Sequence, residues 1–339
     1  MHDPRTAIDN VRPPCDHGRV NVQEQLLQEK IDPFLSNGTL TELCRRGLAG
    51  ERCAVSGYET LTGGCWNRVI GVRCGERDLV LKISPHARDE RIIREYRVLG
   101  EFASRTDLLV PTPLYLDDQS ELLQGTTLVM TRLPGAVMHE CFGLLNYGAR
   151  RRITDEIAED LAHLHRIRAP GFGGVELPEA ERHDEWPDFW LPRFDQAIDE
   201  AAASGSVPAS LVAGAYEVRP HLRPLLRIGE TATMTHYDIW SGNVMVDVEA
   251  DPPRVSGYID IPGFYADAAR ELSFAMLFGV ANRRFFETYL RHHDLDHGFE
   301  LRANVYNLKM NIKHVQMYPG QRVYQQGAAE NLDFIRSHG

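Results

Sequence analysis

Three oxygen-bearing side chains, Asp238, Asn243 and Asp260, have the types and the spacing that phosphoryl transfer requires. Asp238 and Asn243 stand in the pattern H-x-D-x-x-x-x-N, which His236 opens. Asp260 follows after a stretch that predicts a hairpin. A carboxylate can take a proton from a hydroxyl, and Mg²⁺ prefers oxygen ligands. We therefore predict that Asp238 is the catalytic base and that Asn243 and Asp260 bind the metal.

A phosphate-binding cation and loop are expected in residues 53–84. The pattern predicts three strands, and Lys82 ends the apolar run of the third. We expect the Lys82 ammonium to contact the phosphates of a nucleotide. Gly63 and Gly64 lie between the first two strands, where glycine lets the backbone approach a triphosphate closely. Hairpin turns use the same residues, so this pair alone is weak evidence.

The helix predicted over residues 86–105 positions Glu95 as the partner of Lys82. Glu95 lies beside the apolar face of this helix, and a carboxylate on a buried face needs a partner. Taken alone, Lys82 and Glu95 could be an ordinary ion pair. Their order along the chain, before the Asp238 pattern, favours a shared site.

Two further strands are predicted near residues 114–116 and 126–130. They complete five short strands with one helix between the third and the fourth, an order that resembles the N-terminal lobe of kinases. The hinge that meets adenine through backbone groups is then expected at Thr131, Arg132 and Leu133. From residue 150 the pattern becomes mainly helical.

Several other features leave a choice between a functional and a packing role. The acidic and aromatic stretch 184–200 could bind an acceptor or form an ordinary helix start, and the two are equally favoured. We expect His236 to brace its loop, Trp240 to pack on the acceptor side, and residues 292–297 to form a solvated loop rather than a metal site. Thr39, with Glu42 three residues later, is expected to cap a helix.

The stretch HYDIWSGNVMVD, which contains Asp238 and Asn243, resembles the H-G-D-L-W-S-G-N motif of fructosamine kinases and their relatives in the aminoglycoside phosphotransferase superfamily. Residues 63–67, 186–190 and 259–272 are similar to the fructosamine-kinase branch in particular. The resemblance covers about residues 40–335 and is strongest over 235–272.

The resemblance implies an α+β, bilobal, protein-kinase-like fold, with a small antiparallel sheet and one helix in the N-lobe and a larger, mainly α-helical C-lobe. The implied divisions are an N-terminal extension over 1–35, a nucleotide-binding lobe over 36–133, and a C-lobe with catalytic loop and acceptor site over 134–339. ATP and Mg²⁺ are the implied cofactors. The resemblance assigns the same roles to the residues named above and makes Asp267 a structural acid.

Two departures from the family pattern stand out. Tyr237 replaces the usual Gly between the His and the Asp, so its side chain either reshapes the acceptor side or packs outward. Asp260 is followed by Ile-Pro-Gly rather than Phe-Gly, so we expect no activation switch of the protein-kinase type.

The composition limits the classes of partner and the cellular compartment that are expected for this chain. The chain has 339 residues and a net charge of -11, which argues against nucleic acid and is compatible with a cationic small molecule or with simple solubility. Its six cysteines are scattered without a C-x-x-C pair, so we expect no disulfide framework, no zinc site and a reducing compartment. With no signal-peptide pattern and no long apolar run, a cytoplasmic protein without a membrane span is expected.

These observations predict an ATP- and Mg²⁺-dependent phosphotransferase that acts on a hydroxyl of a small sugar-containing molecule. The first expected acceptor is an antibiotic of the aminoglycoside or nucleoside type, as a resistance mechanism. The alternative is a ketosamine-repair kinase, and a nucleotide-binding pseudokinase or interaction protein is the alternative of another class. Neither the hydroxyl, nor ATP against GTP, nor the oligomeric state follows from the pattern.

Overall fold

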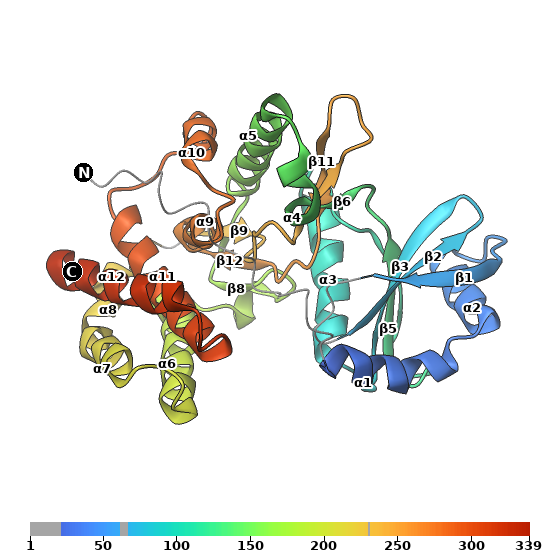
Figure 1. Cartoon of the computed structure of the whole chain (residues 1–339), viewed down its shortest axis with the longest axis horizontal. Helices are drawn as coiled ribbons and strands as arrows, with labels where there is room; N and C mark the ends of the chain where they lie inside the picture. Colours follow the sequence, from blue (N-terminus) through green and yellow to red (C-terminus); the bar gives the residue numbers. More distant parts are fainter. Residues whose placement is uncertain (1–21, 62–66, 230) are drawn as a thin grey trace.

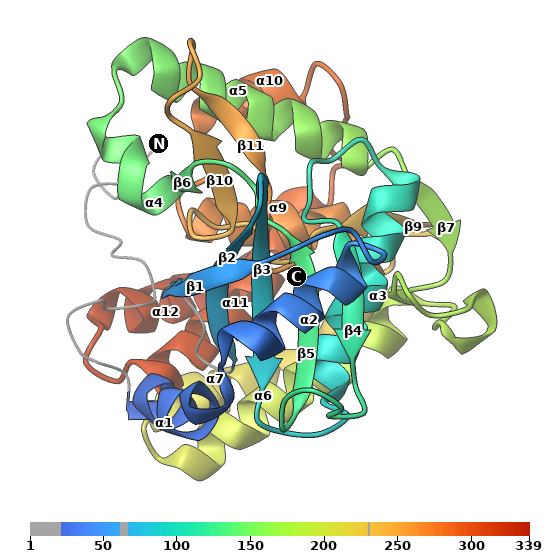
Figure 2. The ribbon, with the colours of Figure 1, turned by 90° about the vertical axis from the view of Figure 1, so that its right-hand side faces the viewer.

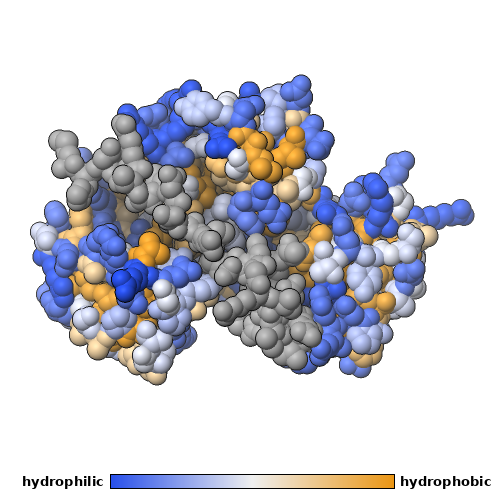
Figure 3. Space-filling model, viewed as in Figure 1, coloured by the Kyte–Doolittle hydropathy of each residue, from blue (hydrophilic) through white to orange (hydrophobic). Residues whose placement is uncertain are grey.

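The computed structural model describes residues 22–61, 67–229 and 231–339, which form two lobes (Figure 1). The N-terminal lobe is built around one sheet, and the larger C-terminal lobe is mostly helical. On the face shown in Figure 3, hydrophilic and hydrophobic residues are mixed over both lobes. The α+β, bilobal architecture expected from the sequence is confirmed.

Five antiparallel strands form the sheet of the N-terminal lobe, in the order β1-β2-β3-β5-β4. Lys82 on β3 pairs with Val69 on β2 and with Leu128 on β5, so it lies inside the sheet rather than at an edge. The order along the chain is the predicted one. The strands are β1 (Val55–Thr60), β2 (Arg68–Cys74), β3 (Arg77–Ser84), β4 (Pro113–Asp117) and β5 (Thr126–Thr131).

Helices cover both faces of this sheet. α3 (Glu90–Arg105) lies between the sheet and the helical lobe, and α2 (Asn37–Gly47) covers the outer face (Figures 1 and 2). α3 begins later than the predicted residue 86, because the Asp89 carboxylate accepts a hydrogen bond from the Arg91 N–H and caps the helix at 3.0 Å. The apolar face predicted for this helix is buried: Ile92, Ile93, Val98, Leu99 and Phe102.

The hydrophobic core is divided by the sheet. On its outer face, Leu40 and Leu43 of α2 pack in one cluster with strand residues such as Leu81. On its inner face, Leu99 and Phe102 of α3 belong to the same cluster as the core of the helical lobe. The helix that carries Glu95 is therefore held from the C-terminal lobe, whereas Lys82 is held by the sheet.

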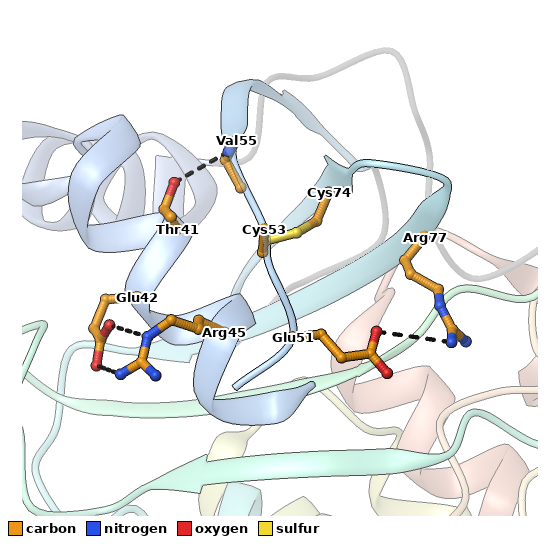
Figure 4. The surroundings of a disulfide bond; sticks show 8 residues. All are labelled: Thr41, Glu42, Arg45, Glu51, Cys53, Val55, Cys74 and Arg77. Atoms are coloured by element: carbon orange, nitrogen blue, oxygen red, sulfur yellow. Dashed lines mark hydrogen bonds and ion pairs between the residues drawn. A yellow bond between two sulfur atoms is a disulfide. The ribbon is translucent and has the colours of Figure 1, made fainter. Parts of the chain in front are cut away.

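The start of α2 differs from the prediction. Ser36, not Thr39, is the cap, because its Oγ accepts a hydrogen bond from the Thr39 N–H at 3.0 Å. The Glu42 carboxylate does not cap the helix. It accepts hydrogen bonds from Arg45 (Figure 4) and from Arg46. Serine and threonine are both good caps, so composition alone does not choose between them.

One pair of cysteines forms a disulfide, although the scattered cysteines had predicted no disulfide framework. Cys53 and Cys74 are joined, with their Cα atoms 5.3 Å apart (Figure 4). They are 21 residues apart in the chain, and the pairing of Val55 with Cys74 in the β1–β2 ladder brings them together. Cys44 and Cys141 are free and buried. The scattering of the thiols therefore no longer supports a reducing compartment.

The C-terminal lobe is mainly helical, as the pattern after residue 150 predicted. Its last helix, α12, was not predicted, although Tyr324, Ala328, Leu332 and Ile335 are buried at helical spacing. The helices are α4 (Met138–Cys141), α5 (Tyr147–Leu164), α6 (Trp186–Ser204), α7 (Ala209–Val218), α8 (Leu222–Leu225), α9 (Ala268–Leu277), α10 (Arg283–Tyr289), α11 (Phe299–Met317) and α12 (Arg322–His338).

Two small sheets position the catalytic loop. One contains β6 (Ala136–Val137), β10 (Val244–Asp247) and β11 (Arg254–Tyr258). The other contains β7 (Arg168–Pro170), β8 (Gly173–Gly174), β9 (Thr231–Thr235) and β12 (Phe264–Ala266). Asp238 lies between β9 and β10, and Asp260 lies between β11 and β12. The β10–β11 pair is the hairpin predicted before Asp260.

The crossing between the lobes depends on Gly135. Its φ is +90°, and a Cβ there would lie 2.0 Å from the carbonyl oxygen of Val246. Only glycine tolerates both the conformation and the contact. The hinge is thereby held against β10, the strand that follows the catalytic loop.

The predicted divisions at residues 35 and 133 remain a proposal. The end of the proposed extension is packed on the N-terminal lobe, because α1 (Val22–Ile31) is followed by Asp32, whose Oδ1 lies 2.9 Å from Nε of Arg68 on β2. Within the described ranges, no helix has the length and apolar character to cross a membrane.

Candidate active site

Lys82 stands between two carboxylates at the bottom of the interlobe cleft. Its Nζ lies 2.5 Å from Oε1 of Glu95 on α3, as predicted, and it also pairs with Oδ1 of Asp260 from the C-terminal lobe. Burial opposes the charge of Lys82, but Asp260 and Glu95 outweigh it and raise the pKa of the amine. The lysine is thus a permanent cation that joins the two lobes.

Asn243 holds Asp238 in place. The Asn243 Nδ2 donates to the Asp238 carboxylate oxygen Oδ2 and to the Asp238 backbone carbonyl, each at 2.9 Å. Burial raises the pKa of Asp238 to about 6, against the opposing charge of Arg270. A carboxylate with a pKa near neutrality is suited to accept a proton from a hydroxyl.

The predicted metal ligands share one cavity. Asn243 uses its nitrogen for Asp238, so its Oδ1 is the atom that can face a cation, and Asp260 adds a carboxylate. Asp260 has a φ of +54°, an uncommon conformation that turns its side chain into the cleft opposite Lys82. One amide oxygen and one carboxylate fit Mg²⁺, which keeps several waters when it binds beside phosphates.

A cavity of about 530 Å³ lies between the lobes. It is lined by the predicted residues Lys82, Glu95, Thr131, Leu133, Asn243 and Asp260. Asp238 is not in the lining and lies beyond Asn243. Apolar side chains form walls suited to a flat ring: Val69, Val80, Met130, Met245 and Ile259. Gly63 and Gly64, the predicted phosphate loop, lie outside the residues that the structure describes.

Two of the three hinge N–H groups already donate hydrogen bonds within the N-terminal lobe. The Thr131 N–H donates to the carbonyl of Thr112, and the Arg132 N–H donates to the carbonyl of Asp78, each at 3.0 Å. Among the described hydrogen bonds, the Leu133 N–H has no acceptor. Of the three predicted hinge residues, Leu133 is therefore the one whose N–H can meet a base.

His236 braces the loop, as expected. The ring is fully buried, its Nδ1 accepts from the Asp238 N–H at 3.2 Å, and its Nε2 lies 3.1 Å from the carbonyl oxygen of Ile259. Burial lowers the pKa of His236, which keeps the ring neutral. One ring nitrogen contacts the backbone of Asp238, and the other contacts the backbone of Ile259, which precedes Asp260. The ring therefore fixes the distance between the two acids.

A buried relay behind the loop was not found from the sequence. The Tyr237 N–H donates to Oε1 of Glu271 at 2.5 Å, and Oε2 of Glu271 lies 2.7 Å from Nε2 of His165. The Nδ1 of His165 lies 2.7 Å from the hydroxyl of Tyr289. Glu271 and His165 are fully buried. Residues of α9 and α10, with the residue that follows α5, thus hold the backbone beside Asp238.

Tyr237 packs inward. Its φ of +80° is the conformation that the usual glycine adopts readily, and a tyrosine there is strained. The ring lies 4.5 Å from the ring of Phe264 and 3.8 Å from the guanidinium carbon of Arg270. Arg270 also donates through Nη1 to the Tyr237 carbonyl at 2.6 Å. Of the two predicted alternatives, packing outward is therefore excluded.

Trp240 does two things. Its ring packs nearly parallel to that of His139, with centroids 5.9 Å apart, and covers Gly242, where a Cβ would lie 2.2 Å from the indole. Trp240 also lines the cavity. The expected packing role is present, and a ligand can still reach the ring.

The acids in residues 184–200 do not face the cleft as a group. Glu185 and Asp188 pair with Arg223, and Asp195 pairs with Arg219. The aromatic residues of the same stretch are buried: Trp186, Phe189 and Trp190. Of the two alternatives for this stretch, the structure favours the packing role for its acids.

Two further ion pairs brace the site. Asp267 caps α9 and accepts from Nε of Arg302 at 2.7 Å and from the hydroxyl of Tyr306 at 2.6 Å, in agreement with a structural acid. Arg94 on α3 donates to Glu176 at 2.6 Å and to the carbonyl of Gly263 at 3.1 Å. These contacts tie α3 and α9 to the segment that carries Asp260.

Residues 57–291 match the phosphotransferase enzyme family, and the chain belongs to this family. Curated relatives include a probable ketoamine kinase of Enterococcus faecium, 23% identical over 268 residues, covering 76% of this chain and 88% of the relative. A second, from Synechocystis sp., is 23% identical over 294 residues, covering 84% and 91%.

Similar solved structures confirm the kinase-like fold. A provisionally named fructosamine-3-kinase of Thermobifida fusca has a TM-score of 0.69 at 19% identity, covering 90% of this chain and 99% of the other. A thermostable mutant of aminoglycoside phosphotransferase APH(4)-Ia has a TM-score of 0.62 at 19% identity, covering 89% and 99%. The chain is an enzyme of the small-molecule kinase class.

Proposed function

We propose that the chain is an ATP- and Mg²⁺-dependent ketosamine kinase, which phosphorylates a hydroxyl on the sugar part of its acceptor. The observation that carries the kinase chemistry is the convergence of Lys82, Glu95, Asn243 and Asp260 on one cavity, with Asp238 held by Asn243 at its edge. The ketoamine kinase relatives support the acceptor class, because each alignment spans most of both chains.

The nucleotide half of the site would work through fixed contacts. The adenine would lie between the apolar walls near Leu133, and Lys82 would keep Glu95 as its partner while its charge faces the phosphates. Mg²⁺ held by Asn243 and Asp260 would neutralise charge that develops on the phosphates. Gly63 and Gly64 are proposed to close over them through backbone groups.

Asp238 would act on the acceptor. The acceptor oxygen forms the new bond to the γ-phosphorus, the bond from this phosphorus to ADP breaks, and the hydroxyl proton passes to the Asp238 carboxylate. Asn243 keeps the carboxylate oriented, and the buried relay through Glu271 holds the backbone next to it. A buried base with a pKa of about 6 is mostly deprotonated at neutral pH and so is ready to take the proton.

The antibiotic acceptor, expected first from the sequence, is the second candidate. Its support is the general likeness in fold to aminoglycoside phosphotransferases. Three of the acids that could have bound a polycation are paired with arginines instead, namely Glu185, Asp188 and Asp195. A pseudokinase is disfavoured, because the residues needed for catalysis are present and brought together.

A panel of acceptors tests the proposal. Fructosyl amines, aminoglycosides and nucleoside antibiotics are each incubated with ATP and Mg²⁺, nucleotide consumption is followed, and products are identified by mass spectrometry. We expect a product 80 Da heavier only from ketosamines, and none with Asp238→Asn. Phosphorylation of an antibiotic alone would reverse the order of the two candidates. ATP consumption equal in the wild type and in Asp238→Ala would overturn both.

A further inference from the structure

Three cations lie close to one another beside Tyr237, the residue before Asp238, and outside the residues that line the cavity. They are Arg193 on α6, Arg270 on α9 and Lys309 on α11, and we call them the cationic wall. Arg270 lies over the ring of Tyr237, the residue next to Asp238 in the chain. The wall therefore borders the place where an acceptor must present its hydroxyl.

Aromatic rings rather than carboxylates support these cations. The guanidinium carbon of Arg193 lies 3.7 Å from the centre of the Phe189 ring, and Nη1 of Arg193 donates to the Phe189 carbonyl at 2.6 Å. The amine of Lys309 lies 5.6 Å from the centre of the Trp190 ring. Ring faces attract cations but do not neutralise them. The net positive charge of the wall is left uncompensated by its supports.

The supporting rings form one continuous layer. Tyr237 contacts Phe264 at 4.5 Å between ring centres, and Phe264 contacts Phe189 at 5.4 Å. The layer then continues through Trp186 and Tyr306 to Trp190, with neighbouring centres 5.2–6.3 Å apart. The three cations are thus carried by one rigid surface rather than by separate flexible segments.

Among the described residues, none of the three cations takes part in an ion pair. Asp238 acts on Arg270 and Glu200 acts on Lys309 only through their charges. Other acids nearby have partners of their own. Glu271 is used by Tyr237 and His165, and Asp267 is used by Arg302. Asp188 and Asp195 on α6, and Glu185 just before it, are used by Arg223 and Arg219.

The crowding of positive charge is visible at Lys309. Partial burial, together with the charges of Arg270, Lys313 and Arg193, lowers the pKa of its amine to about 7, against the attraction of Glu200. A half-buried cation held at a high local positive potential favours a negative group from outside the chain. An arginine offers such a group a planar fork, and a lysine offers a point charge.

We propose that the cationic wall binds an anionic group of the acceptor, so that the substrate is a ketosamine whose amine part carries a carboxylate. The inference rests on the proposed kinase function and adds the charge of the acceptor to it. A phosphate on the acceptor shares this chemistry and is the other source of negative charge. Polycationic aminoglycosides would meet like charges at the wall, which opposes their binding.

Three acceptors separate the sources of charge. They are a fructosyl amino acid, the fructosyl amine that lacks the carboxylate, and the same amine with a phosphate on its sugar. Each is assayed with the wild type, Lys309→Met, Lys309→Arg and Lys313→Met. Lys313 is exposed and lies one turn further along α11, so it is the matched control for loss of one positive charge.

We expect Lys309→Met to raise KM for the fructosyl amino acid about tenfold or more, with little change in kcat or in KM for ATP. KM for the amine without carboxylate should stay the same, and Lys309→Arg should restore most of the affinity. Lys313→Met should change KM for the fructosyl amino acid far less than Lys309→Met does, because Lys313 acts on Lys309 only through its charge. The proposal is overturned if both acceptors lose affinity equally or if neither does. If Lys309→Met raises KM only for the acceptor with the sugar phosphate, the anionic group that the wall binds lies on the sugar and not on the amine part.

A binding measurement separates this inference from the kinase proposal. Inorganic phosphate is titrated into ADP-saturated wild type, Lys309→Met and Lys313→Met, with tryptophan fluorescence as the readout because Trp190 faces Lys309. Saturable binding lost only in Lys309→Met supports the wall even if no ketosamine is phosphorylated. Equal titrations in all three proteins overturn it even if ketosamines are phosphorylated.

Discussion

The two sides of the cleft handle charge in opposite ways. On the nucleotide side, Lys82 stands between Glu95 and Asp260, and Arg94 is paired with Glu176. On the acceptor side, Arg193 and Lys309 lie over aromatic rings and form no ion pair among the described residues. The nucleotide side is preorganised by its own salt bridges, whereas the acceptor side is proposed to be completed by its ligand.

The difference also explains why the nucleotide side can be recognised in the sequence and the acceptor side only in the structure. Phosphates and a metal demand particular residue types in a particular order, so the nucleotide side leaves a motif. An acceptor subsite demands only a charge of the right sign at the right place, and α6, α9 and α11 supply one residue each. Such a site is recognisable once the helices are assembled.

The largest effect is expected at Asp238. Asp238→Asn should lower kcat by about 10²–10⁴-fold, because the amide cannot take the hydroxyl proton. ATP affinity, measured by calorimetry, should survive. Asp184→Asn, an exposed acid on the same lobe, is the control and should keep its activity. Full turnover by Asp238→Asn would rule out this residue as the base.

Lys82→Met should come next, lowering kcat/KM for ATP about hundredfold, because the phosphates lose their cation. KM for the acceptor should stay the same, which separates the two sides of the cleft. Steady-state kinetics with each substrate varied in turn provides the measurement. An equal loss of affinity for both substrates would show that the sides are not independent.

A tenfold effect is expected at the proposed metal. Asn243→Ala should raise the Mg²⁺ concentration for half-maximal activity about tenfold, because one oxygen ligand is lost. The same substitution frees Asp238, so kcat at saturating Mg²⁺ should fall as well. A Mg²⁺ titration identical to that of the wild type would count against Asn243 as a ligand.

The smallest effect is a pH dependence on the acceptor side. Lys309 is a cation below its pKa of about 7 and neutral above it. KM for a carboxylate-bearing acceptor should therefore be low at pH 6 and rise several-fold by pH 8, because charge-assisted binding is lost. Arg193, Arg270, Lys313 and Glu200 surround the amine.

Lys309→Met is the control for this profile and should abolish the pH dependence of KM. The acceptor without a carboxylate should show the same KM at both pH values with either protein. A rise in KM that persists in Lys309→Met would assign the titration to another group.

Sequence patterns were sufficient for the five-strand lobe, for α3 and for the placement of Lys82, Glu95, Asn243 and Asp260 around one cavity. Each of these follows from local spacing, either the alternation of a strand, the period of a helix or a short motif. The catalytic role of Asp238 and the metal stay predictions for the experiments above.

Features that join distant segments could not be predicted in the same way. His165 and Glu271 are 106 residues apart, and nothing in their local surroundings marks them as partners. Cys53 and Cys74 meet only because β1 pairs with β2. The wrong prediction of the α2 cap has a different origin. Ser36 and Thr39 are both good capping residues and stand three positions apart, and only the folded backbone shows that the helix begins after Ser36.

Tyr237 has a consequence for how acceptors change over evolutionary time. Its backbone keeps the turn that a glycine would adopt, with its N–H and carbonyl held by Glu271 and Arg270, while its ring packs against Phe264 and Arg270 on the proposed acceptor side. Substitution at this one codon alters what the acceptor touches and leaves the proton acceptor next to it in place. Substrate range can therefore drift at Tyr237 without selection having to rebuild the catalytic loop.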